Sequence, residues 1–263
     1  MSKDMDKKKL VKLIIAQCAA QAREGAFIHD FKVFLDYVEK EKIEVTPKLR
    51  LIPLKHCRNI TALFRQPDPI ERKLGRRIYK ARSQDELPRL SFIDFLATAS
   101  GCTKVTAKGY YRKGPYLADF REAECLQRFG VLFLSWWDYF PWAALLRCGG
   151  DFAECLQKNR AAIIPVLHRA CRQRKVDIKQ FADEVLEATG VRWESEAGDP
   201  DNQDARWGVR MIIIRALTYF EAIERIEVEG EYGPKTVAFS LREPLGKWLV
   251  SILPLPPPSL FAS

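Results

Sequence analysis

Residues 207–239 read WGVRMIIIRALTYFEAIERIEVEGEYGPKTVAF, and this stretch decides the fold class. Its first part, as far as Glu224, carries apolar residues in the dense pattern of a buried helix. Two short runs, Ile226–Glu229 and Thr236–Phe239, then alternate on either side of a Gly-rich segment, which predicts a β-hairpin. A last apolar run from Leu245 predicts a final helix. The predicted order is helix, hairpin, helix.

Two further helices are predicted before this stretch, over residues 160–175 and 178–189, and the second ends at Gly190. Residues 160–253 therefore form the predicted C-terminal module. Residues 114–159 are predicted to be an aromatic helical connector. Its tryptophans lie among almost no cations, so core or interface packing is favoured over stacking on nucleic-acid bases.

The N-terminal part contains a short internal repeat. Phe34–Val38 is echoed by Phe92–Leu96, and Val45–Lys48 is echoed by Val105–Lys108. Because both matches occur in the same order, residues 1–113 are predicted to hold two similar modules, each with a helix, a short strand and a Thr-containing corner. Residues 254–263 are predicted to be a proline-rich tail, which binds a proline-reading module or is simply an extended end.

The predicted helices, hairpin and final helix resemble a winged-helix module. Phe239–Gly246 is similar to the strand-to-helix corner that closes many winged helices, and Val45–Lys48 and Val105–Gly109 look like the same corner. In this form the chain resembles uncharacterised bacterial winged-helix proteins related to a plasmid-borne open-reading-frame family, although Lys48–Leu49 stands where that family has Gly. The resemblance implies a mainly α fold with short β-hairpins, built from tandem winged-helix-like modules, and it implies no catalytic residues.

The positive charge is concentrated in one stretch. Residues 40–113 carry eighteen basic and seven acidic side chains, a net charge of +11, whereas residues 1–39 carry +1 and residues 114–263 carry −3. Such a cluster attracts phosphates or an acidic surface, although a merely solvated face is the alternative. The predicted nucleic-acid contacts are Lys48, Arg50, Lys55, Arg58, Arg72, Lys73, Arg76, Arg77, Lys104, Lys108, Arg112 and Lys113.

These features predict a nucleic-acid-binding protein that uses residues 40–113 as a basic face, as a regulator or accessory factor, with DNA favoured over RNA. Tyr110 and Tyr111 lie between basic residues and either stack on bases or pack within a hairpin. The alternative is a non-enzymatic protein-interaction scaffold of winged-helix modules whose basic face meets an acidic protein surface. The aromatic content is compatible with a homodimer.

Other classes of protein are disfavoured. We expect no enzyme, because the sequence has no Ser-His-Asp grouping and no phosphate-cradling glycine loop. We expect no metal or other cofactor, because the seven cysteines form no Cys-x-x-Cys pair and the three histidines lack ligand spacing. The longest apolar run, Val131–Leu146, is interrupted by polar residues and no signal peptide is evident, which predicts a cytoplasmic protein without a membrane span.

Overall fold

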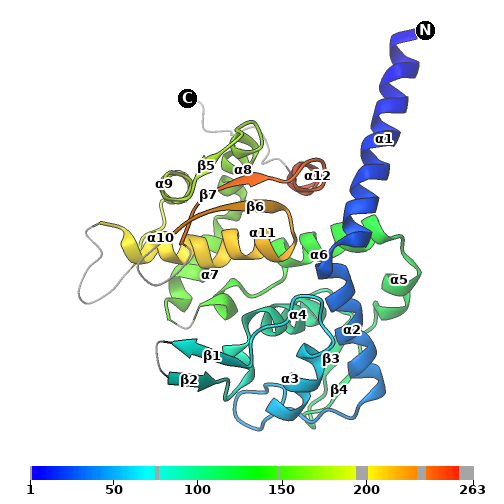
Figure 1. Ribbon diagram of the computed structural model, residues 1–263, viewed down its shortest axis with the longest axis vertical. Coiled ribbons are helices and arrows are strands. Elements are labelled where there is room, and N and C mark those ends of the chain that lie inside the picture. Colours follow the sequence, from blue (N-terminus) through cyan, green and yellow to red (C-terminus); the bar gives the residue numbers. More distant parts are fainter. Residues whose placement is uncertain (1, 75–76, 147, 194–200, 230–234, 255–263) are drawn as a thin grey trace. The chain divides into compact units, whose positions relative to one another are not determined.

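The chain divides into two compact units (Figure 1). Unit 1 comprises Met1–Ala19 and Pro141–Ser263, and unit 2 comprises Ala20–Phe140. The computed structural model describes residues 2–74, 77–146, 148–193, 201–229 and 235–254. The division at residues 140 and 141 lies inside the segment 114–159, so it differs from the predicted domain limits at residues 113 and 159.

Helix α1 (Ser2–Glu24) runs across the division at residue 19. The helices and strands of unit 2 are α2 (Ala26–Lys40), α3 (Leu54–Thr61), β1 (Glu71–Leu74), β2 (Arg77–Lys80), α4 (Pro88–Ala99), β3 (Thr103–Val105), β4 (Tyr111–Lys113), α5 (Leu117–Glu122) and α6 (Cys125–Asp138). The helix predicted in each of the two repeats is confirmed, since Phe34–Val38 lies in α2 and Phe92–Leu96 lies in α4.

The hairpin of β1 and β2 was not predicted. The two strands pair antiparallel, with Glu71 opposite Lys80 and Arg72 opposite Tyr79. The alternation of the hairpin is hidden in the sequence, since most of its residues are charged and few are apolar.

The two repeats of the N-terminal part meet in one small sheet. β3 and β4 pair antiparallel, and residues 43–45 lie along the other edge of β4 through an isolated bridge between Glu44 and Tyr110. The Tyr111 N–H donates to the Ile43 carbonyl at 3.1 Å, and the Val45 N–H donates to the Gly109 carbonyl at 2.8 Å. The segments predicted as two separate modules are therefore parts of the same unit.

A cluster of phenylalanine rings forms the core of unit 2. The ring centroid of Phe27 lies 6.2 Å from Phe31, 6.3 Å from Phe92 and 5.6 Å from Phe129, which joins α2, α4 and α6. α4 is buried on most of its surface. On α6, Trp136 and Trp137 are 0% and 1% exposed, which confirms that the tryptophans of this helix pack in a core.

Unit 1 contains a three-stranded antiparallel sheet in the order β5–β7–β6. Its elements are α7 (Gly150–Lys158), α8 (Ile164–Ala170), β5 (Val176–Asp177), α9 (Ile178–Thr189), α10 (Gln203–Val209), α11 (Arg215–Tyr219), β6 (Ile223–Val228), β7 (Lys235–Leu241) and α12 (Leu245–Ser251). A π-helical turn, Arg210–Ile214, joins α10 to α11. The Asp177 carboxylate accepts from the Gln180 N–H at 2.9 Å and so caps α9.

The hairpin and the last helix predicted for unit 1 are confirmed, whereas β5 was not predicted. Phe181 of α9 packs edge-on against Phe239 of β7, with ring centroids 5.3 Å apart. A mainly helical fold with small antiparallel sheets is thus confirmed. Of the predicted tail, residues 254–263, all but Pro254 lie outside the described residues. In the described part of the chain, no helix has the length and apolar character needed to cross a membrane.

Candidate nucleic-acid interface

In the first Thr-containing corner, residues 46–51, the hydroxyl group of Thr46 closes the turn. The Thr46 N–H donates to the Leu51 carbonyl at 2.8 Å, and the Leu51 N–H donates back to Thr46 Oγ1 at 3.0 Å. Between them Arg50 adopts a φ of 53°, in the left-handed region. A hydroxyl that accepts from a nearby backbone N–H is a common way for threonine to fix a turn.

The second corner repeats this arrangement. The Thr106 N–H donates to the Tyr110 carbonyl at 2.9 Å, and the Tyr110 N–H donates to Thr106 Oγ1 at 3.1 Å. Gly109, with a φ of 81°, precedes the closing residue as Arg50 does in the first corner. The sequence repeat therefore corresponds to a repeated turn, in which an arginine holds a conformation that normally favours glycine.

Arg50 also joins the two corners. Its Nη2 donates to the Thr106 carbonyl at 2.9 Å, across 56 residues of sequence. The cations at the tips of the corners, Lys48 and Lys108, are both exposed. The corners thus present basic side chains from two distant parts of the chain on neighbouring turns.

The outer face of the small sheet continues this basic surface. Lys104 and Arg112 lie directly opposite each other on β3 and β4, and both are exposed. Tyr110 lies two residues from Arg112, hence on the same face of the strand. Its ring centroid is 5.0 Å from Lys42 Nζ and 5.7 Å from the Arg112 guanidinium carbon, and its hydroxyl donates to Glu44 Oε2 at 3.0 Å.

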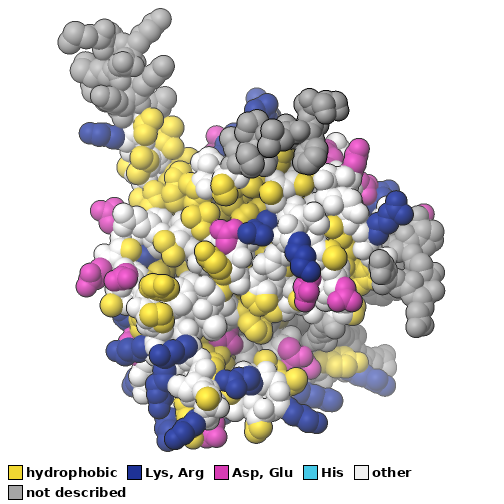
Figure 2. All heavy atoms as spheres, turned by 180° about the vertical axis from the view of Figure 1, so that it is seen from behind, with side chains coloured by type: hydrophobic (Ala, Val, Ile, Leu, Met, Phe, Trp, Pro, Cys, Tyr) yellow, Lys and Arg dark blue, Asp and Glu magenta, His cyan; other side chains and the backbone are white. Residues whose placement is uncertain are grey.

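We call this surface the basic corner; its cations are Lys42, Lys48, Arg50, Lys104, Lys108 and Arg112. Within the part of the chain that the structure describes, none of the six forms an ion pair with a carboxylate. Like charges directly opposite each other on a sheet are destabilising, so the pair Lys104 and Arg112 is not explained by stability. Figure 2 shows Lys and Arg side chains gathered over the lower part of unit 2 in that view.

Not every predicted contact residue belongs to the basic corner. Lys113 pairs with Glu39 at 2.7 Å, and the exposed side chains of Lys55 and Arg58 belong to α3. The hairpin β1–β2 carries Arg72, Lys73 and the exposed Arg77 and lies apart from β3–β4 (Figure 1). Arg76 lies outside the described residues.

The inner side of β4 is held by a buried polar network. Tyr111, 2% exposed, donates from its hydroxyl to Asp94 Oδ1 at 2.5 Å. Gln84 donates from Nε2 to Asp94 Oδ2 at 2.7 Å and accepts from the Ile52 N–H at 2.6 Å. These bonds tie the exit of the first corner to α4 and to the strand that carries Arg112, so the network fixes the basic corner from beneath.

The protonation of this network is set by its burial. Burial raises the pKa of Asp94 to about 6, although the hydrogen bonds from Tyr111 and Gln84 oppose the increase. Burial also raises the pKa of Tyr111, and the negative charge of Asp94 adds to this effect. The Cys57 thiol, which donates to the Ile52 carbonyl at 3.2 Å, has its pKa raised by burial to about 12. Tyr111 and Cys57 thus stay protonated near neutral pH and act as hydrogen-bond donors.

Two basic features were not predicted from the sequence. Lys42 was not selected, and only its position over Tyr110 places it in the basic corner. In unit 1, Arg210, Arg215 and Arg225 line a pocket of about 220 Å³ on the face of the helix formed by α10, the π-helical turn and α11. The net charge of the sequence did not indicate these arginines, because residues 114–263 are slightly acidic overall.

Among the described residues, no group of three or more His, Cys, Asp or Glu side chains is placed to hold a metal ion. No protein-family model matches the chain, and neither a curated protein nor a solved structure matches it.

Proposed function

We propose that unit 2 binds nucleic acid, with duplex DNA favoured, through the basic corner, and that the protein is a regulator or accessory DNA-binding factor. The observation that carries the proposal is the set of six exposed cations on the two corners and the outer face of β3–β4. Two of them, Lys42 and Arg112, lie over the Tyr110 ring, and the tyrosine hydroxyl holds Glu44. Such a surface suits the phosphate backbone, because neutralising phosphates releases the counterions that surround DNA.

The order of elements supports a winged-helix origin for both units. In unit 2 the order is α2, residues 43–45, α3, α4, β3 and β4, with the hairpin β1–β2 inserted before α4. In unit 1 it is α8, β5, α9, the helix of residues 203–219, β6 and β7. In each unit the first strand pairs with the last, so we propose two tandem winged-helix-like modules in which β3–β4 is the wing of unit 2.

In winged-helix proteins the helix before the wing is the usual contact with the major groove. In unit 2 this helix is α4, and Thr98 is its one exposed residue, the others being buried or half-buried. We therefore assign the contacts of unit 2 to the wing and the corners rather than to α4.

The test is a titration with duplex DNA at several salt concentrations. Replacing Lys104 and Arg112 with glutamine removes two phosphate contacts, so the slope of log affinity against log salt should become shallower by about 1.8. The control is the variant Arg172→Gln/Lys175→Gln, which removes the same charge from two exposed residues of unit 1. Absence of binding at low salt, or an unchanged slope in the first variant, would contradict the proposal.

A groove beside the first corner favours a second function, a protein-interaction scaffold. It has a volume of about 440 Å³, and most of its lining is apolar. Leu49 at its rim is 72% exposed. An extended protein segment with apolar side chains would fit this groove. Replacing Leu49 with asparagine removes the apolar side chain without adding charge beside Lys48 and Arg50. It should weaken such binding strongly but change the affinity for duplex DNA little, so the variant separates the two functions.

A further inference from the structure

A second basic site in unit 2 lies away from the basic corner. It is a pocket of about 550 Å³ between the end of α1, one face of α2, Arg65 and residues 123–125 at the start of α6. Its charged and polar lining contains more basic than acidic groups. The basic side chains are Arg23, His29, Lys32, Arg65 and Arg128. None of them belongs to the proposed nucleic-acid contacts.

Arg23, Lys32 and Arg128 line the pocket together with Cys125. Burial raises the pKa of the Cys125 thiol, whereas the positive charges of Arg128, Arg23 and Lys32 act in the opposite direction. Cations from three helices are thus close enough to the same thiol to act on it electrostatically. Arg23 and Lys32 lie on the consecutive helices α1 and α2, whereas Arg128 lies on α6, about a hundred residues later in the sequence.

The acidic groups near the pocket are already engaged. Asp36 pairs with Arg121 at 2.7 Å. Glu124 forms a capping box with Gln127, in which its side chain accepts from the Gln127 N–H and its own N–H donates to Gln127 Oε1 at 3.0 Å. Within the described residues, neither carboxylate forms an ion pair with Arg23, Lys32 or Arg128.

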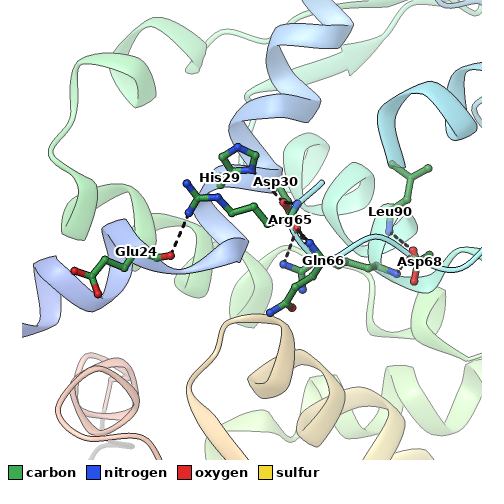
Figure 3. Close-up of polar contacts among 8 residues, drawn as sticks. Glu24, His29, Asp30, Arg65, Gln66, Asp68 and Leu90 are labelled. Carbon is green, nitrogen blue, oxygen red and sulfur yellow. Dashed lines mark hydrogen bonds and ion pairs between the residues drawn. The ribbon is translucent and has the colours of Figure 1, made fainter. Parts of the chain in front are cut away.

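The buried acid next to the pocket is also satisfied. Asp30, 0% exposed, accepts from the Arg65 N–H at 2.6 Å and from Arg89 Nε at 2.9 Å. Figure 3 shows Asp30 beside the backbone of Arg65 and Gln66, while the Arg65 side chain extends to the Glu24 carbonyl. The hydrogen bonds to Asp30 and to the Glu24 carbonyl thus fix the position of Arg65. Within the described residues, Arg23 and Lys32 have no carboxylate at ion-pair distance.

The start of α6 contributes its first residue, Cys125, to the lining of the pocket. Ile28, Val33 and Ala123 form apolar walls beside the cations. The pocket is larger than a phosphate needs, and its volume lies in the range of small-molecule sites.

We propose that this pocket binds a phosphoryl group, held by Arg23, Lys32 and Arg128, with the molecule that carries it resting on the apolar walls. The phosphoryl group comes either from a small phosphorylated molecule or from the 5′ end of a nucleic-acid strand. The proposal does not depend on nucleic-acid binding by the basic corner.

The experiment is calorimetric titration of the full chain with pyrophosphate, repeated with the variant Arg23→Gln/Lys32→Gln. Both side chains are exposed, so the variant should fold, which thermal unfolding checks. We expect saturable binding by the native chain and a loss of affinity of about tenfold or more in the variant. The variant Arg172→Gln/Lys175→Gln should bind as the native chain does.

Two further arms identify the source and separate this proposal from the proposed function. A nucleoside monophosphate is compared with short single strands that carry or lack a 5′-phosphate, and preference for the phosphorylated strand assigns the pocket to strand ends. Pyrophosphate binding should persist in the variant Lys104→Gln/Arg112→Gln. No saturable binding of pyrophosphate, or equal binding by the Arg23→Gln/Lys32→Gln variant, would overturn the proposal.

Discussion

At the scale of single residues, Arg50 combines a backbone cost with a side-chain contact. Its left-handed φ of 53° costs a non-glycine residue roughly 1 kcal/mol, and its guanidinium donates to the Thr106 carbonyl. Gly109 takes the corresponding place in the second corner without that cost. Arginine therefore stands where glycine would be easier for the backbone, and its side chain joins the two corners through the Thr106 carbonyl.

Substitutions at these two positions should therefore mirror each other. Arg50→Ala loses the hydrogen bond and keeps the strain, so Arg50→Gly should be about 1 kcal/mol more stable than Arg50→Ala. Gly109→Ala should lower the free energy of unfolding by about 1 kcal/mol, because alanine is strained at the left-handed φ of this position. The new Cβ would add no clash, since it would lie 3.6 Å from Val45 Cγ2, an ordinary contact distance. Urea unfolding measures both differences. An alanine at position 50 that matches glycine in stability would argue against strain in the corner.

Asp94 should give the fold a particular pH dependence. Its pKa is raised in the folded state to about 6, so the folded state binds its proton more tightly than the unfolded state does. The stabilisation from this proton is complete below the unfolded pKa, near 4, and is lost as the pH rises through about 6. The loss amounts to about 3 kcal/mol for a shift of about two units.

Asp94→Asn should remove this loss, although the new amide places a donor against the Gln84 donor and lowers the stability at every pH. The free energy of unfolding, measured by urea at several pH values between 4 and 7, gives the difference between native chain and variant. Exposed Asp119 on α5, changed to Asn, is the matched control. A native-minus-variant difference that does not change with pH would refute the assignment.

At the scale of elements, the start of α4 depends on a residue from another part of the chain. Asp68 Oδ2 accepts from the N–H groups of Arg89 and Leu90, both at 2.9 Å (Figure 3). These N–H groups have no partner within the helix, and Asp68, 8% exposed, is largely shielded from water. The cap therefore also holds the segment before β1 against α4.

Replacing Asp68 with alanine should cost about 1–2 kcal/mol of unfolding free energy, because two N–H groups lose their acceptor. Asp68→Asn keeps an oxygen acceptor and should recover most of the loss. Chemical denaturation of the two variants in parallel is the measurement. Equal destabilisation by alanine and asparagine would mean that the charge of Asp68, rather than the cap, matters.

The elements that could be predicted are those with a local signal. α2 and the hairpin β6–β7 follow from the spacing of apolar residues, which needs only neighbours in sequence. β5 is two residues long and exists through its pairing with β7, more than sixty residues later. The hairpin β1–β2 was not predicted, because most residues of its strands are charged and give no apolar alternation.

The candidate site was predictable only as a list of cations. Five of the six cations of the basic corner were predicted, since their charges cluster in sequence. Their grouping was not, because it depends on the Arg50–Thr106 bond and on the pairing of residues 43–45 with β4. The Asp94 network likewise joins Ile52, Gln84 and Tyr111, whose distances in sequence carry no signal.

At the scale of the whole molecule, the division at residue 140 predicts that unit 2 is an independent folding unit. It has its own phenylalanine core and its own buried network. A fragment of residues 20–140 should unfold cooperatively on heating and bind duplex DNA with the salt dependence of the full chain. Circular dichroism and the titration described above are the measurements. A fragment that remains unfolded would show that unit 2 needs the rest of the chain.

The burial of α4 has a consequence for selectivity. A reading helix tells base pairs apart in the major groove, whereas a wing and turns reach mainly sugars and phosphates, which every duplex shares. If unit 2 binds DNA as proposed, its affinities for unrelated duplexes of equal length should lie within a small factor of one another. Bulk genomic DNA would then compete almost as well as any chosen site, and unit 2 would supply affinity for DNA without a preference for sequence.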